Sequence, residues 1–199
     1  MGCLRNIIRA IILTLAIIGF LSLGGKDLVS GWLKNYFNPS QEIMLERAKK
    51  VGDFSQVNEE FEIEKAAGIM GYNAVVAEHK ASGQKMIVVD SGTKPIITSE
   101  DITSPDAEEK LKNSIKKVKY QAFSVDKFEI TKRGNISSYG KTVPYVKFEA
   151  SVKKLPIGDI AGIVSVVKDS NGQDRILVSV SEKEKYSQLL SDEFFKYIK

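Results

Sequence analysis

An uncharged apolar stretch near the amino terminus constrains this chain more than any other feature of its sequence. Between Ala10 and Leu23 no side chain is ionisable, and nine of the fourteen residues are Ile, Leu or Phe. Each such side chain favours insertion into a bilayer by roughly 0.3 to 0.6 kcal/mol. Arg5 and Arg9 precede the stretch four residues apart, on one helical face, where their stems reach back to the headgroups. The sequence therefore predicts contact with membrane lipid through residues 4–25.

Three interpretations of this segment are open. As a helix, residues 4–25 are about 33 Å long, enough to span a hydrocarbon layer of about 30 Å. The same basic and apolar regions also fit a secretory signal peptide cleaved near Gly24, and a buried helix of a soluble protein is the third alternative. Trp32, Tyr36 and Phe37 follow at helical spacing, which is typical of a membrane-interface belt. This aromatic cluster favours an uncleaved anchor.

The charges around the apolar stretch predict its orientation. Arg5, Arg9 and the amino terminus precede it, so the positive-inside rule places the short N-terminus in the cytoplasm and the remainder outside. The expected protein is single-pass, with an extracytoplasmic C-terminal domain; the alternative is a secreted or periplasmic protein. We divide the chain into an anchor or signal at 1–25, interfacial and stalk helices at 26–53, and a domain at 54–199. Cys3 is the one cysteine, so an intramolecular disulfide is excluded.

The domain alternates between helical and strand periodicity. Asn38 and Pro39 open a helix that ends at Gly52, and from Phe61 apolar residues alternate with glutamates as in a half-buried strand. Strands are expected from 61, over 69–78, 85–90, 96–97, 122–132, 143–152, 160–168 and 175–181, and helices over 105–119 and from about 182. A bulge is expected between Val125 and Phe128, and a polar loop over 134–140.

These elements predict an α+β fold with one antiparallel sheet of about six to seven strands, covered by two main helices. The final helix would face inward with Tyr186, Leu189, Leu190, Phe194 and Ile198. The order of hairpin, helix, four strands and final helix resembles the α/β/α sandwich of photosystem-P-like extracytoplasmic proteins, although no motif assigns the chain to that family.

Two short similarities suggest an internal duplication of hairpin-plus-helix units. Residues 67–70 (AGIM) resemble 161–164 (AGIV), and residues 82–89 (SGQKMIVV) resemble 171–178 (NGQDRILV). Ordinary hairpins share such turns and strands, so chance similarity is the alternative.

Chemical motifs are few. His79 is the single histidine, and without cysteine or histidine partners it predicts neither a metal site nor a general base; we expect it to face water on an edge strand. Ser82 and Lys85, and likewise Ser114 and Lys117, have the Ser-x-x-Lys spacing of some hydrolases, but each pair falls on a turn or an exposed helix. No cofactor, metal or catalytic residue is predicted, and enzymatic activity stays uncertain.

The net charge of +4 conceals a strong split. Residues 40–109 contain seven basic and fourteen acidic side chains, whereas residues 110–154 contain twelve basic and three acidic ones. The two regions could simply neutralise each other within the fold. Alternatively, the basic region contacts an anionic lipid, an anionic polymer or an acidic protein. Nucleic acid is not expected, because few aromatic residues interleave with the lysines.

These observations favour a membrane-anchored, extracytoplasmic, non-enzymatic binding or scaffolding module. The candidate binding surface is represented by Lys116, Lys117, Lys153 and Lys154. The alternatives are a hydrolase of envelope substrates with an unrecognised site, which would need a pocket and a hydrogen-bonded partner around His79, and a carrier of lipid or small apolar ligands.

Overall fold

The computed structural model describes residues 41–69, 72–90, 97–106, 119–120, 123–153 and 159–199. The elements are α3 (Gln41–Val51), β1 (Phe61–Ile69), β2 (Tyr72–His79), β3 (Lys85–Asp90), α4 (Ser99–Thr103), β4 (Lys119–Tyr120), β5 (Phe123–Ser138), β6 (Lys141–Lys153), β7 (Asp159–Lys168), β8 (Asp174–Glu182), the 3-10 helix η1 (Lys183–Lys185) and α6 (Gln188–Lys196). Of the helices in these ranges, none is long and apolar enough to cross a membrane. The predicted anchor at 4–25 lies outside the described residues.

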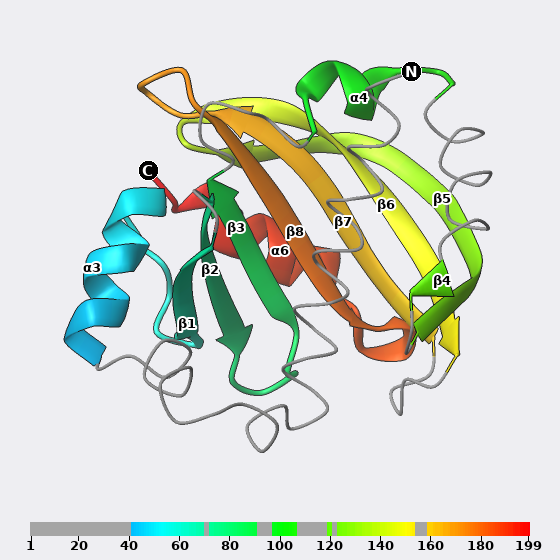
Figure 1. Cartoon of the computed structure of the whole chain (residues 1–199), viewed down its shortest axis with the longest axis horizontal. Helices are drawn as coiled ribbons and strands as arrows, with labels where there is room; N and C mark the ends of the chain where they lie inside the picture. The colour runs from blue at the N-terminus through cyan, green and yellow to red at the C-terminus, as the bar shows by residue number, and fades with distance from the viewer. Residues whose placement is uncertain (1–40, 70–71, 91–96, 107–118, 121–122, 154–158) are drawn as a thin grey trace.

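One antiparallel sheet organises the domain, as the sequence predicts (Figure 1). Its strand order is β1-β2-β3-β8-β7-β6-β5-β4, so the β2–β3 hairpin pairs with the β7–β8 hairpin at the centre. Seven strands have six or more residues, and β4 adds a two-residue strand beside β5. The acidic β1 and the basic β5–β6 pair therefore stand toward opposite ends of the sheet, and they do not neutralise each other by direct pairing.

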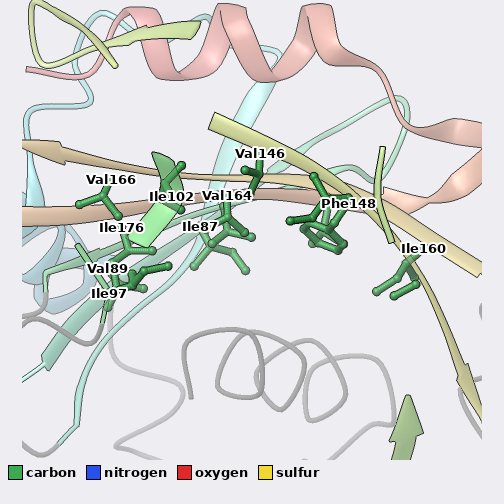
Figure 2. Close-up of a cluster of buried hydrophobic side chains, with 14 of the residues drawn as sticks. Ile87, Val89, Ile97, Ile102, Val146, Phe148, Ile160, Val164, Val166 and Ile176 are labelled. Atoms are coloured by element: carbon green, nitrogen blue, oxygen red, sulfur yellow. The ribbon is translucent and has the colours of Figure 1, made fainter. Parts of the chain in front are cut away.

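Both faces of the sheet carry apolar side chains. One face, here called the α4 face, includes Val76, Ile87, Val89, Phe128, Ile130, Val146, Phe148, Ala150, Val164, Val166, Ile176 and Val178, with Ile97 and Ile102 packed on it. Figure 2 shows this cluster gathered on one side of the strands. The opposite face, here called the α3/α6 face, includes Val75, Ala77, Met86, Val88, Ile163 and Leu177, with residues of α3 and α6 packed on it.

Helix α3 forms as predicted and packs on β1, β2 and β3. Ala48 and Val51 are buried in the core. The end of the helix is joined to the far end of the described chain, because the backbone of Asp53 exchanges two hydrogen bonds with Lys199. The Tyr139 hydroxyl donates to the Val51 carbonyl at 2.7 Å. This helix therefore contributes to the domain core, more fully than its thin apolar stripe suggests.

Helix α4 precedes the helix expected at 105–119. Thr98 caps it, with its hydroxyl accepting from the Asp101 backbone while the Asp101 carboxylate accepts from the Thr98 backbone. The Thr-x-x-Asp spacing of this capping box is a local signal for the start of a helix, although the sequence analysis did not predict α4. Ile97, expected in an edge strand, is a buried residue just before this helix. Residues 107–118, which hold most of the predicted helix, lie outside the described residues.

The β5–β6 hairpin is longer than expected. The predicted polar loop at 134–140 is wrong: β5 continues to Ser138, and the turn is confined to Tyr139 and Gly140, with φ of 48° and 69°. Residues 134–138 are mostly polar, but they include Ile136, whose side chain is buried. This composition is compatible with a strand that is exposed on one side. The bulge between Val125 and Phe128 is confirmed by a register shift, and a second shift follows Ile130.

The C-terminal helix begins later than expected, after η1, and this changes its inward face. Leu189, expected inside, is 79% exposed, whereas Phe195 is completely buried. A buried polar contact ties this helix to the β2–β3 turn: the Gln84 amide nitrogen donates to Ser179 Oγ at 2.8 Å and to Ser191 Oγ at 3.1 Å.

The two central hairpins agree only in part with the suggested duplication. Gly83 and Gly172, which the longer similarity aligns, both have positive φ. The shorter similarity fails, because residues 67–69 lie in β1, two strands before β3, whereas residues 161–164 lie in β7, immediately before β8. Duplication therefore stays a prediction supported by the turns alone.

Candidate functional site

The residues predicted for membrane and partner contacts fall mostly outside the described part of the chain. These residues are Arg5, Arg9, Trp32, Tyr36, Phe37, Lys116, Lys117 and Lys154. Lys153 is the last residue of β6. What the structure does place is the middle of the basic region, because β5 and β6 span most of residues 123–153.

Over residues 127–132 and 147–151 the β5–β6 hairpin is apolar on the α4 face and charged on the other, whereas nearer the turn Ile136 and Tyr145 are buried in the α3/α6 cluster. Phe128, Ile130 and Phe148 are buried on the α4 face. The intervening side chains project to the side on which α3 and α6 pack, and they are exposed or half-exposed. We call this set the open sheet surface; it consists of Lys127, Glu129, Lys132, Lys147, Glu149 and Ser151, together with Lys183 of η1. With four lysines and two glutamates, the surface carries a net positive charge.

One row of this surface is neutralised. Glu129 lies directly opposite Glu149 in the strand register, which by itself would be repulsive. Lys127 approaches Glu129 at 3.5 Å, and Lys183 approaches Glu149 at 2.6 Å. The hydrogen bond that the Lys183 ammonium donates to the Glu149 carboxylate raises the pKa of Lys183. Each glutamate of the row therefore has its own lysine.

The next row is not neutralised. Lys132 lies directly opposite Lys147, and within the described ranges neither ammonium has an ion-pair partner. The Lys147 ammonium instead lies 4.9 Å from the centre of the Tyr186 ring. The Tyr186 hydroxyl is held by Gln188 and Ser191 at 3.0 and 3.2 Å, and burial raises its pKa. A neutral tyrosine ring therefore fixes one lysine of the pair.

His79 differs from the prediction. Its strand, β2, is flanked by β1 and β3, and the residue is 8% exposed instead of facing water. Its Nδ1 atom contacts the Ser82 hydroxyl at 2.8 Å and accepts from the Ser82 backbone N–H at 3.2 Å. Its Nε2 atom is 3.7 Å from a carboxylate oxygen of Glu60, and its ring packs against Phe61. The imidazole thus stabilises the β2–β3 turn through its contacts with the hydroxyl and backbone N–H of Ser82.

Lys85 is engaged with carboxylates and not with Ser82. It pairs with Glu64 at 2.8 Å and with Glu78. Burial raises the pKa of Glu64, and the neighbouring Glu78 adds to this effect. For Glu78, the Lys85 ammonium and the bond to Glu64 outweigh burial and lower the pKa. The hairpin pattern in the sequence is sufficient to place Glu78 opposite Lys85. The bulge in β1 that brings Glu64 close to Lys85 has no signal in the sequence.

Arg175 forms the most buried ion-pair cluster in the described ranges. It is 4% exposed and pairs with Asp90, the last residue of β3, and with Asp169 at 2.8 Å. The other Asp169 oxygen accepts from the backbone of Asn171 and Gln173. All three charged groups are thus used to join the β7–β8 turn to the end of β3.

No protein-family model matches this chain, and no curated protein matches it. The function must therefore be argued from the chain's own surface. In the ranges that the structure covers, no group of three or more His, Cys, Asp or Glu side chains is placed to hold a metal ion. Ser114 and Lys117 lie outside those ranges.

The sequence analysis singled out neither the Lys132–Lys147 pair nor its contact with Tyr186. The alternation over 143–152 places Lys147 on the polar side, and that signal was available. The pairing of Lys132 with Lys147 depends on the register shift after Ile130, which the sequence pattern does not mark.

Proposed function

We propose that this chain is a membrane-tethered, extracytoplasmic, non-enzymatic binding module that contacts an anionic partner through the open sheet surface. The observation that carries the proposal is the one-sided β5–β6 hairpin. Its apolar side is buried, while its other side presents lysines in excess over glutamates on a rigid pair of strands. Such a surface favours association with negatively charged groups and makes it dependent on salt.

The tether is supported by the sequence and by the position of α3. The apolar segment at 4–25 precedes Gln41, the first residue of α3, and this helix packs on the sheet. In a module attached in this way, the element that follows the tether is α3, a helix packed on the sheet. The predicted lysines Lys116, Lys117, Lys153 and Lys154 remain part of the proposed basic contact region.

A charge-removal comparison tests this proposal. The full chain is embedded in nanodiscs of neutral phosphatidylcholine, and two anionic probes are added separately: labelled poly-L-glutamate and vesicles containing phosphatidylglycerol. Changing the four lysines of the open sheet surface to Gln (K127Q, K132Q, K147Q, K183Q) should weaken binding of at least one probe by about tenfold or more and flatten its salt dependence.

The matched control removes four other lysines that lie outside the surface (K49Q, K50Q, K168Q, K196Q). It should bind the probes like the unmodified chain, although its net charge changes by the same amount. Equal binding by both variants would show that the open sheet surface is not the contact site. A second variant, K116E/K117E/K153E/K154E, extends the test to the lysines predicted from the sequence.

A hydrolase is the second candidate, favoured by the contacts of His79 with Ser82 and Glu60. An imidazole between a hydroxyl and a carboxylate is the arrangement that activates a serine nucleophile. The full chain is treated with a fluorophosphonate, and the Ser82→Ala variant serves as the control. Labelling that disappears in the variant would support this candidate, and no labelling above the variant's level would eliminate it.

A further inference from the structure

The two like-charged rows of the open sheet surface are treated differently by the fold. The Glu129–Glu149 row has one lysine for each carboxylate, at 3.5 and 2.6 Å. The Lys132–Lys147 row has no carboxylate partner among the described residues, although like charges directly opposite on neighbouring strands repel each other. A tyrosine ring near Lys147 attracts that ammonium but supplies no negative charge. The pair is therefore left with an electrostatic cost that an external anion would remove.

The arrangement suits a compact anion that accepts several hydrogen bonds. Directly opposed residues of an antiparallel pair have Cα atoms about 4.5 to 5.5 Å apart, so two lysine stems can bring their ammonium groups to one phosphate. Contact with Tyr186 restricts Lys147 before any ligand arrives, which lowers the entropy lost on binding. A phosphate offers acceptor oxygens to both ammonium groups at once.

The neighbouring row limits what else can bind. Glu149 is two residues from Lys147 along β6, about 6 to 7 Å away, and Glu129 is three residues from Lys132 along β5, across the register shift that follows Ile130. An extended acidic polymer following the strands would place further negative charges over these glutamates. A single phosphate separated from the next by neutral material avoids that repulsion. The charge pattern therefore favours isolated phosphate groups over a continuous polyanion.

The position at which the chain enters the domain indicates a source of such phosphates. The predicted membrane segment ends at residue 25, 16 positions before Gln41, and a chain of that length reaches at most about 60 Å when extended. Helix α3 packs on the same side of the sheet from which Lys132 and Lys147 project. The tether and the lysine pair can therefore face one bilayer together.

On these grounds we propose that the Lys132–Lys147 pair binds the phosphate group of an anionic membrane lipid. This inference rests on the proposed function, since it specifies the anionic partner of the open sheet surface. The domain then lies with its α3/α6 side toward the bilayer, held by the amino-terminal segment at one point and by lipid phosphate at another.

Amine footprinting of the full chain tests the proposal. The protein is reconstituted in nanodiscs of phosphatidylcholine alone or of phosphatidylcholine with phosphatidylglycerol, treated briefly with an amine-reactive reagent, and analysed by mass spectrometry. Phosphatidylglycerol should slow modification of Lys132 and Lys147 by about fivefold each. Lys127 and Lys183, which have glutamate partners on the same surface, are internal controls and should change little.

Two matched variants separate this proposal from the broader one. K132Q/K147Q should lose most of the binding of added phosphatidylglycerol vesicles, whereas K127Q/K183Q should retain most of this binding and the phosphatidylglycerol-dependent protection of Lys132 and Lys147. Equal losses in the two variants would overturn the phosphate site and leave the proposed binding surface standing. No loss in either variant would overturn both. Circular dichroism on each variant confirms that the fold is retained.

A final arm identifies the source of the phosphate. Inorganic phosphate is added to the full chain in neutral nanodiscs. If it protects Lys132 and Lys147 while phosphatidylglycerol does not, the lipid is excluded as the ligand. If poly-L-glutamate gives the same selective protection as phosphatidylglycerol, the preference for isolated phosphates is wrong.

Discussion

The α3/α6 face of the sheet has a covered half and an open half. Around β2, β3 and β8, the side chains on this face are apolar, and Met86, Val88 and Leu177 are completely buried. On β5 and β6, Ile136 and Tyr145 continue this buried cluster near the hairpin turn, and farther from the turn the positions on the same side carry Lys127, Glu129 and Lys147. Figure 1 shows α6 behind the sheet and α3 beside β1 and β2. The same antiparallel pairing thus builds a core where helices cover it and an exposed charged surface where charged residues replace apolar ones.

The α4 face does not differ between the covered half and the open half. Val89, Ile176 and Phe148 belong to one continuous apolar cluster across the sheet. The difference between the halves resides in alternate residues of the strands and in the helices that meet them. Stability should therefore respond strongly to changes in the covered half and weakly to changes in the open half.

The largest expected effect is removal of a covering aromatic ring. Phe194→Ala takes away a 1% exposed side chain of α6 that contacts Phe54, Phe61 and Phe195, and should lower the free energy of unfolding by about 3 to 5 kcal/mol. Urea unfolding of the full chain in detergent, followed by circular dichroism, measures this change. A loss below about 1 kcal/mol, the size expected of a surface change, would mean that α6 does not cover a cooperative core.

A smaller effect is expected from the ionic cluster on the other side of the covered half. Lys85→Met leaves Glu64 and Glu78 adjacent without a cation, and should cost about 1 to 2 kcal/mol at neutral pH, because these side chains are only partly buried. The cost should shrink as the pH falls, since protonation of a carboxylate removes the repulsion.

The direction of this pH dependence follows from the pKa shifts of the two carboxyl groups. The pKa of Glu78 is lowered in the fold, so its contribution to stability is present above its ordinary value of 4.5 and is lost as the pH falls. The pKa of Glu64 is raised, so its contribution is present below 4.5 and is lost as the pH rises through the folded pKa. Urea unfolding of both proteins between neutral and acidic pH measures the difference; a cost that grows on acidification would contradict this account.

The open half should show a gain in stability. Lys132→Glu replaces a like-charged cross-strand pair by an opposite-charged one with Lys147, and should raise the free energy of unfolding by about 0.2 to 1 kcal/mol at low salt. The gain should decrease at high salt because the residue is exposed. The same variant should bind phosphatidylglycerol vesicles less well. Reduced stability at low salt would show that the lysine pair is not under electrostatic repulsion.

The smallest effect is expected at the exposed leucine of the covering helix. Leu189→Gln alters a side chain that is 79% exposed and should change the free energy of unfolding by less than about 0.5 kcal/mol. Leu190→Ala is the matched comparison, because Leu190 packs against the α3/α6 cluster and should cost more. Equal costs at the two positions would place Leu189 in the core, as the helical pattern first suggested.

The elements that were predicted well are those set by neighbouring residues. The hairpin across Asn171 and Gly172, the strand from Lys85 to Asp90 and helix α3 depend on turn residues, alternation and caps, all of which are local. The failures involve choices between local signals. Residues 134–138 are polar enough for a loop, yet pairing with β6 makes them a strand. No motif in the sequence predicts a partner for His79. Its burial follows from the position of β2, which lies between β1 and β3 in the sheet.

The sequence by itself determined the α+β class, the antiparallel hairpins, the one-sided pattern of β5 and β6, and the prediction of an amino-terminal membrane segment. Each of these depends on the period of apolar residues along a few turns or strands. Only the tertiary structure decided that β3 pairs with β8, that α3 and α6 cover half of one face, and that Lys132 lies opposite Lys147. These are contacts between distant parts of the chain, and their register depends on bulges and on which apolar faces bury each other, information that no local pattern contains.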